Sequence, residues 1–349
     1  MCKVRSIYKK LVLIMMSMVA YSCYCAESWT WLYEKRFTRE EQHTNHMRSE
    51  LHFAEYGIPE FTQLVFSWNG FRHCCGHFSF WIQARDAQTQ RWGNWHKMME
   101  WGADIQRSYL NKQDVTSYHH VRLEMAPERT GDAFRVRVIA HDQADLSLLK
   151  ALMVCGSHFG KFQQELIDTA ITALPSVYVK NVPRQSQFIL EHEDNRKMCS
   201  PTSCSMLLGY LMDGVIDPID FARRSYDGGL QAYGSWPFNT AHAFERCNGR
   251  AWFATARLQS FGALHKRLQE GIPVVVSVRG ELEGAPKKYE SGHLLVVVGW
   301  NARKQRVICH DPALDADEKT LTHYPLDAFL RAWERSHRLA YLAELVKNF

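Results

Sequence analysis

The 349-residue chain lacks the features that mark several specialised protein classes. It has no short repeat, no low-complexity tract and, outside the N-terminus, no run of lysine and arginine residues. A net charge of +5, from 42 basic and 37 acidic residues, gives no reason to expect a nucleic-acid partner. A Gly-x-x-x-x-Gly-Lys motif is also missing, so nothing indicates ATP binding at a phosphate-binding loop.

Paired cysteine motifs are missing as well. No Cys-x-x-Cys pair occurs, so a common structural zinc site is not expected, and we expect neither a metal nor a cofactor. Seven cysteines follow the N-terminal region: Cys74, Cys75, Cys155, Cys199, Cys204, Cys247 and Cys309. With one free thiol, up to three disulfides are possible, but the spacing does not fix their pairing. If Cys74 and Cys75 lie in a strand, they point to opposite faces of it; the alternative is that they are packing residues.

Residues 1–26 have the pattern of a signal peptide. Basic residues precede the apolar run 11–20, which is too short to span a bilayer, and small residues follow up to Ala26. No later segment is apolar enough to cross a membrane, so we expect a secreted or periplasmic protein without a membrane span after cleavage. A lipid anchor at Cys23 is less favoured, because the residues before it match an acylation site poorly.

The length favours two domains, and the hydrophobic period changes near Cys155. Between residues 29 and 155, apolar and polar residues alternate, which predicts an all-β antiparallel sandwich as an accessory domain. The clearest alternating segments are 63–68, 78–82, 121–125 and 134–138. Residues 156–180 are expected to form a linker with one short helix. We expect residues 181–349 to form a second, α+β domain.

Two side-chain clusters in the first domain have alternative interpretations. Trp92, Trp95 and Trp101 suit either hydrophobic fill between the sheets or a stacking platform for a sugar or peptide, and fill is favoured. The second cluster consists of three histidines: His43, His46 and His52. They have no evident carboxylate partner, so we expect them to be solvated rather than to bind a metal.

In the second domain, helices are expected first and strands later. Helical spacing follows Cys199, and strongly β-branched strands come after residue 271. The remaining helices are expected at 219–224, 238–246 and 258–270, and the strands at 272–278, 293–300 and 306–310. A cleft between the helical half and the sheet half would be a natural active site.

Cys199 lies where a polar turn meets an apolar helix. Pro201 suits a first helical turn, and the apolar spacing predicts a helix from about Thr202 to Met212, with Cys199 at or just before the N-cap. Unpaired N–H groups and the positive end of the helix dipole would favour a nucleophilic thiolate there. A small buried cysteine beside a tight turn is the alternative interpretation.

A nucleophilic thiol needs partners, and three residues are placed to supply them. His293, at the start of a central strand, could act as the base, and Asp311, at the end of the next strand, could fix its tautomer. Gln187, with Gln185 behind it, is the best-placed side-chain amide for an oxyanion hole. Taken singly, each also suits an ordinary structural role.

Several rival residues are less suitable. Cys204 would lie inside the helix, where burial raises its pKa, and His310 should point to the opposite face from Asp311. No partner is evident for His242 or His323.

The order of these residues resembles the papain-like cysteine peptidases of family 39, the group that includes bacteriocin leader peptidases. The matching elements span residues 180–349: Val182-Pro183, Ser186-Gln187, Cys199-Ser200-Pro201-Thr202-Ser203, Gly292-His293 and Asp311-Pro312. Ser200 stands where the family usually has glycine. The resemblance implies a cysteine peptidase with Cys199 as nucleophile, His293 as general base, Asp311 as orienting acid and Gln187 as oxyanion donor.

We therefore expect an exported thiol peptidase that hydrolyses a peptide or protein substrate, for instance a cell-envelope peptide. A leader-peptidase role is not favoured, because those relatives are joined to an ATP-driven transporter. Two alternatives remain. The chain could be a catalytically inactive cell-envelope binding protein, or an acyltransferase or transglutaminase-like enzyme that uses the same Cys, His and Asp.

Overall fold

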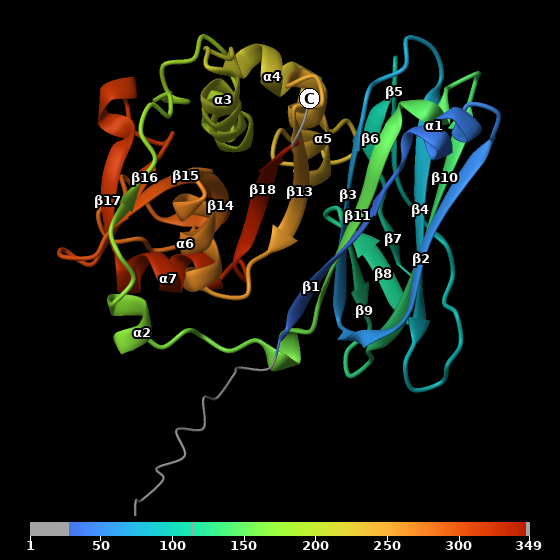
Figure 1. The fold of residues 1–349 in the computed structure, drawn as a ribbon, viewed down its shortest axis with the longest axis horizontal. Coiled ribbons are helices and arrows are strands. Elements are labelled where there is room, and N and C mark those ends of the chain that lie inside the picture. The colour runs from blue at the N-terminus through green and yellow to red at the C-terminus, as the bar shows by residue number, and fades with distance from the viewer. Residues whose placement is uncertain (1–27, 113–114, 347–349) are drawn as a thin grey trace, which may run out of the picture.

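The computed structural model describes residues 28–112 and 115–346. Two antiparallel sheets come first, and a third sheet with most of the helices follows (Figure 1). The expected signal peptide, residues 1–26, lies outside the described residues. Across those that are described, no helix combines the length and the hydrophobicity needed to cross a membrane.

The first two sheets form as the alternating pattern predicts. One has six strands in the order β1 (Thr30–Arg36), β11 (Leu149–Ser157), β3 (Gln63–Gly70), β9 (Arg122–Met125), β8 (Thr116–His119) and β7 (Asn111–Lys112). The other has five: β2 (Glu50–Phe61), β10 (Gly131–His141), β4 (His77–Asp86), β5 (His96–Gly102) and β6 (Gln106–Ser108). Side chains of both sheets share one core, in which Trp68 stacks on Phe80 with ring centroids 4.5 Å apart.

The tryptophan and histidine clusters separate in space. Trp101 is fully buried in the shared core, which agrees with hydrophobic fill. Trp92 and Trp95 are half-buried, and each lies beneath an arginine, with the Arg135 guanidinium 3.8 Å from the ring of Trp92. His43, His46 and His52 are all exposed, as expected for solvated side chains. Two of them nevertheless have a carboxylate neighbour, since the long-range fold brings Asp145 to His46, and Glu50 lies beside His52.

The C-terminal part contains a seven-stranded antiparallel sheet. Its strands run in the order β13 (Ala251–Arg257), β18 (Leu339–Leu345), β14 (Val274–Gly280), β15 (Tyr289–Asn301), β16 (Arg306–His310) and β17 (Leu321–Pro325), and β12 (Val177–Tyr178) also pairs with β15. The α-helices in the described part of the chain are α1 (Arg39–Asn45), α2 (Thr169–Thr172), α3 (Cys199–Met212), α4 (Pro218–Ser225), α5 (Trp236–Arg246), α6 (Phe261–Gln269) and α7 (Leu326–Glu334). The predicted order of helices first and strands later was wrong, because β13 precedes α6.

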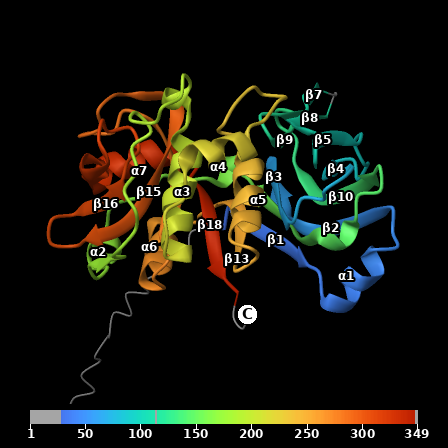
Figure 2. The ribbon, with the colours of Figure 1, turned by 90° about the horizontal axis from the view of Figure 1, so that it is seen from above.

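The segment expected to be a linker, residues 156–180, is partly structured. Its first residues complete β11, α2 is the expected short helix, and β12 adds to the C-terminal sheet. A deep interface nevertheless joins the two parts more directly. In Figures 1 and 2, α5 and β13 lie beside β3 of the six-stranded sheet.

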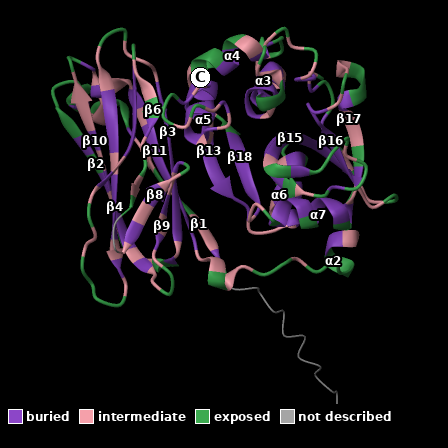
Figure 3. Cartoon of the chain, turned by 180° about the vertical axis from the view of Figure 1, so that it is seen from behind, coloured by how far each residue is buried: buried purple, intermediate pink, exposed green. Residues whose placement is uncertain are grey.

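Buried polar side chains on β3 hold β13. Asn69 donates from Nδ2 to the carbonyl of Phe253 at 2.6 Å and accepts from the same residue's N–H at 2.8 Å. Ser67 Oγ accepts from the Thr255 N–H at 3.2 Å. Figure 3 shows that buried residues cover β13 and β18 and continue into β3 and β11. The interface is therefore part of the protein's interior.

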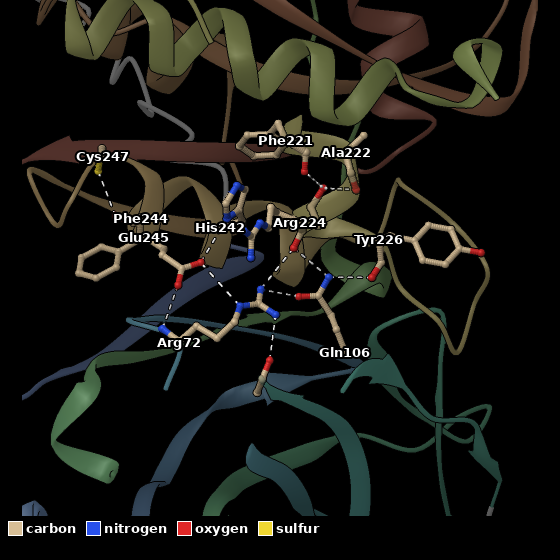
Figure 4. Close-up of polar contacts among 12 residues, drawn as sticks. Arg72, Gln106, Phe221, Ala222, Arg224, Tyr226, His242, Phe244, Glu245 and Cys247 are labelled. Carbon is tan, nitrogen blue, oxygen red and sulfur yellow. Dashed lines mark hydrogen bonds and ion pairs between the residues drawn. The ribbon is translucent and has the colours of Figure 1, made fainter. Parts of the chain in front are cut away.

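Arg72 makes a second connection between the two parts (Figure 4). Its guanidinium donates to the Gln106 side chain at 2.7 Å and to the Arg224 carbonyl at 3.3 Å. Its backbone N–H donates to Glu245 at 2.9 Å, and Glu245 also contacts His242 at 3.2 Å. Sequence reasoning missed this partner of His242, although Glu245 lies three residues later in the same helix, a spacing that places two side chains on one face.

We expect Asn69→Ala to lower the free energy of unfolding by about 2–4 kcal/mol, because it leaves a buried N–H and a buried C=O of Phe253 without partners. Ser67→Ala, which removes one bond to the same strand, should cost about half as much. Urea unfolding of the full chain measures both. Equal losses for the two variants would contradict this account of the interface.

Candidate active site

Cys199 is the first residue of α3, whose N-cap is Met198. The helix begins three residues earlier than predicted, since Pro201 is tolerated within a first turn. At this position the Cys199 N–H has no acceptor within the helix. Ser200, which replaces the usual glycine of the family that the sequence resembles, is fully buried, and its hydroxyl lies 2.9 Å from that of Tyr341.

His293 faces the same place from β15. The strand begins four residues earlier than predicted, and Val278 of β14 is the residue paired with His293. Gly292 has a φ of +91°, a value that other residues rarely adopt. The imidazole is buried, and Nε2 lies 2.7 Å from Oδ1 of Asp311. Nδ1 is therefore the ring nitrogen left for the thiol, with which the imidazole also interacts.

Asp311 follows β16 directly and is fully buried. Both of its oxygens are saturated with donors. Oδ1 accepts from His293 and from the N–H of Ala313 at 2.8 Å, while Oδ2 accepts from the hydroxyls of Tyr289 at 2.7 Å and Tyr324 at 2.6 Å. Donors to a carboxylate favour its ionised form, so the carboxylate is held charged in the interior.

Sequence reasoning missed Tyr289 and Tyr324. Tyr289 also stacks on His293, with ring centroids 4.1 Å apart, and so fixes both members of the pair. A signal existed for Tyr289, because residues four apart in a strand lie on the same face. Tyr324 comes from β17 and reaches Asp311 only through the register of β16 and β17, which the sequence does not encode locally.

The electrostatics favour an ion pair between Cys199 and His293. Burial opposes the charged thiolate, but the hydrogen bond and the charge of His293 outweigh it, so the pKa of Cys199 is lowered. Burial also opposes the imidazolium, but the charge of Asp311 outweighs this effect and raises the pKa of His293 to about 9. Backbone N–H groups of Leu294 and Ser200 assist the thiolate. Against burial, the charge of His293 lowers the pKa of Asp311.

The rival residues lie elsewhere. Cys204 is buried inside α3, where burial raises its pKa well above the usual range of a thiol. His310 bonds to the carbonyl of Pro183 at 3.0 Å, away from the thiol, and burial lowers its pKa to about 4. His323 is exposed on β17.

Gln187 lies close to the site, but its side-chain amide already forms a hydrogen bond. Its Nε2 donates to the carbonyl of Asn195 at 2.9 Å, just before α3, and its buried Oε1 has no partner among the described residues. The amide carries a second hydrogen that this bond does not use. Gln185 instead donates to the carbonyl of Ile216 at 2.8 Å.

Cys199 opens into a cavity of about 660 Å³. The sequence predicted a cleft between two halves of the second domain, but one wall here belongs to the N-terminal sheets. That wall includes Gln63, Arg122 and Glu124, while Ser277, Gly292 and Leu294 line the opposite side. This volume falls in the range of about 300–1,000 Å³ that is usual for ligand sites.

Residues 179–341 match the Peptidase_C39 like family. This match supports a cysteine peptidase in this part of the chain. No curated protein matches the chain. Among solved structures, xylellain, a cysteine protease from Xylella fastidiosa, matches with 12% identity and a TM-score of 0.33 over 53% of this chain and 91% of its own.

One side-chain group outside the peptidase domain has metal-ligand chemistry. His73, Cys74 and Cys75 place one ligand atom each within 4.8 Å of the others. Cys74 and Cys75 lie in an exposed turn rather than in a strand or in the core, so they neither point to opposite faces of a strand nor act as packing residues.

We expect iodoacetamide to label Cys199 of the peptidase domain rapidly at about pH 6, since a lowered thiol pKa and a raised imidazole pKa populate the thiolate at that pH. In His293→Ala, burial opposes the thiolate and only backbone N–H groups still favour it, so labelling at pH 6 should fall by on the order of tenfold or more. Peptide mass spectrometry locates the label. Fast labelling of the variant at pH 6, or preferential labelling of Cys204, would contradict the ion pair.

Tyr324→Phe removes one donor from Asp311 and should weaken its hold on the imidazolium. We expect the pH midpoint of Cys199 labelling to rise, because a less stabilised imidazolium supports the thiolate less well. Tyr178→Phe, on the exposed ring of β12, is the matched control and should leave the midpoint unchanged. An unchanged midpoint in Tyr324→Phe would show that the three remaining donors suffice.

Proposed function

We propose that the chain is an exported thiol peptidase that hydrolyses peptide bonds through an acyl-enzyme on Cys199. One observation carries this proposal: His293 interacts with the Cys199 thiol on one side and bonds to the buried Asp311 on the other, at the wall of a cavity large enough for a peptide segment. The N-terminal targeting pattern supports export.

In the first half of the reaction, the Cys199 thiolate attacks the carbonyl carbon of the scissile bond. The tetrahedral intermediate carries a negative oxygen, for which the N–H of Cys199 and the remaining amide hydrogen of Gln187 are the proposed donors. When the intermediate collapses, the C–N bond breaks and the imidazolium of His293 gives its proton to the leaving amine. The acyl group then remains on the sulfur as a thioester.

In the second half, neutral His293 takes a proton from a water molecule as the water oxygen attacks the thioester. The C–S bond breaks, the acid product leaves, and the thiolate–imidazolium pair is restored. Asp311 stays ionised throughout and keeps Nδ1 of His293 directed at the sulfur. The four hydrogen-bond donors around Asp311 keep its carboxylate ionised and in place.

In this proposal, the N-terminal sheets form a β-sandwich that helps to hold the substrate. The contribution of Gln63, Arg122 and Glu124 to the cavity wall supports that role. The boundaries 29–155 and 181–349 remain our proposed division, although the two parts share a buried interface. An acyltransferase would favour a dry acceptor pocket, and the charged lining of this cavity gives that alternative no support.

The test is hydrolysis of a mixed peptide library by the purified chain, with products identified by mass spectrometry. Cys199→Ala should abolish cleavage, whereas Cys75→Ala, which removes an exposed thiol outside the site, should retain it. Cleavage by the Cys199→Ala variant would contradict the proposal. A reactive Cys199 without any cleavage would instead favour the binding-protein alternative.

A further inference from the structure

The cavity next to Cys199 has an unbalanced set of charges. Among the described residues that line it, four are arginines and one is a glutamate: Arg122, Arg257, Arg279, Arg335 and Glu124. Its other ionisable lining residues are the thiol of Cys199 and two histidines, His120 and His337.

The single carboxylate is already engaged. Glu124 accepts from Arg122 and from His119 at 2.7 Å each, and from the amide of Gln63 at 3.0 Å. Arg122 and Glu124 therefore neutralise each other within the N-terminal wall. Among residues 28–112 and 115–346, no carboxylate pairs with Arg257, Arg279 or Arg335.

Arg279 and Arg335 are fixed in place by backbone groups. Arg279 donates from Nε to the carbonyl of Glu290 at 3.1 Å, and Arg335 donates from Nη1 to the carbonyls of Arg279 and Glu281 at 3.3 and 3.2 Å. A side chain at Gly280 would come within 2.7 Å of Arg335 Nη1, so the glycine leaves room for this guanidinium. Within the described chain, neither arginine forms an ion pair, and each keeps donors that these bonds do not use.

Arg257 adds a buried charge behind them. It is 8% exposed, and its guanidinium donates to the carbonyls of Ser336 and His337 and to the side chain of Gln63. Its Nε has no partner among the described residues. Carbonyl groups solvate a guanidinium without neutralising it, so the buried charge of Arg257 is not compensated by these bonds. The positive charge of Arg257 therefore acts on a ligand in the cavity.

Arg279 and Arg335 line the same cavity as Cys199. Arg279 lies on β14 two residues after Ser277, which lines the cavity too, because residues two apart in a strand share a face. Arg335 follows α7 and contacts the backbone on both sides of Gly280. Both arginines are exposed, so a substrate that reaches Cys199 through this cavity can meet their free guanidinium donors.

We propose that this cleft selects peptides with a carboxylate close to the scissile bond, and that Arg279 and Arg335 bind that carboxylate. The inference rests on the proposed peptidase function and names its substrate class. Guanidinium groups bind carboxylates through paired N–H donors, a geometry that neutral amides reproduce poorly. The carboxylate can come from an Asp or Glu side chain or from the C-terminus of the peptide.

The experiment compares matched peptides built on one cleaved sequence. With the termini blocked, a peptide with Glu beside the scissile bond is compared with its Gln and Lys counterparts, and a fourth peptide has Gln and a free C-terminus. We expect kcat/KM for Glu to exceed that for Gln by about 10- to 100-fold and to fall as salt is raised. A preference for the fourth peptide over its blocked form identifies the chain terminus as the carboxylate source.

Two variants test whether Arg279 and Arg335 cause the preference for Glu over Gln. Arg279→Gln combined with Arg335→Gln should reduce the ratio of kcat/KM for Glu over Gln towards one. Arg331→Gln removes an arginine one turn earlier on α7 that pairs with Asp327 and does not line this cavity, so the ratio should not change. Equal cleavage of all peptides by the wild type, or an unchanged ratio in the double variant, would overturn the inference.

Binding separates this inference from the peptidase proposal. Fluorescence anisotropy of the labelled peptides with Cys199→Ala measures selection without catalysis. Stronger binding of the Glu peptide, lost in the double arginine variant, supports the carboxylate site even if no peptide is hydrolysed. Equal binding of the Glu, Gln and Lys peptides contradicts it even if hydrolysis occurs.

Discussion

The geometry of the site depends on the buried contact between His293 and Asp311. Both side chains are almost free of solvent, and a buried carboxylate is tolerated only when its lone pairs are used. Here two tyrosine hydroxyls, one backbone N–H and the imidazole meet that need. These donors come from β15, from β17 and from the turn after β16, so the register of three neighbouring strands is built around one carboxylate.

The contact between His293 and Asp311 also determines where α3 must place the thiol of Cys199. The imidazole has one nitrogen committed to Asp311, and only the other can meet Cys199. The thiol is presented by the first residue of α3, and Ser203 fixes the helix to the strand by donating to the carbonyl of Leu294 at 3.0 Å. A shift of α3 by one residue would rotate the thiol by about 100° around the helix axis and remove it from the imidazole. Burial of the helix from Ser200 to Gly209 opposes such a shift.

The sequence predicted what depends on local pattern. Four strands of the first two sheets, the helix after Cys199 and the contact between His293 and Asp311 follow from periodicity and from residue order. What it could not predict comes from distant pairing. β13 was missed because its residues, Ala251–Arg257, alternate weakly, and its place is set by β18 and by Asn69. Tyr324 was missed because only the β16–β17 register brings it to the carboxylate. For the same reason, Gln63, Arg122 and Glu124 gave no local sign that they would line the cavity.

The contribution of the N-terminal sheets explains why the two parts share so large a buried interface. Gln63 bonds to Arg257 from one part and to Glu124 from the other, so it joins the two walls of the cavity at one side chain. A loosely tethered accessory domain could not maintain this contact, because a shift of about 1 Å breaks a hydrogen bond. Arg257 is costly to bury, and its charge lacks a carboxylate partner among the described residues. An anionic substrate in the cavity would offset that cost, which makes the rigidity of the interface a condition for substrate selection as well as for stability.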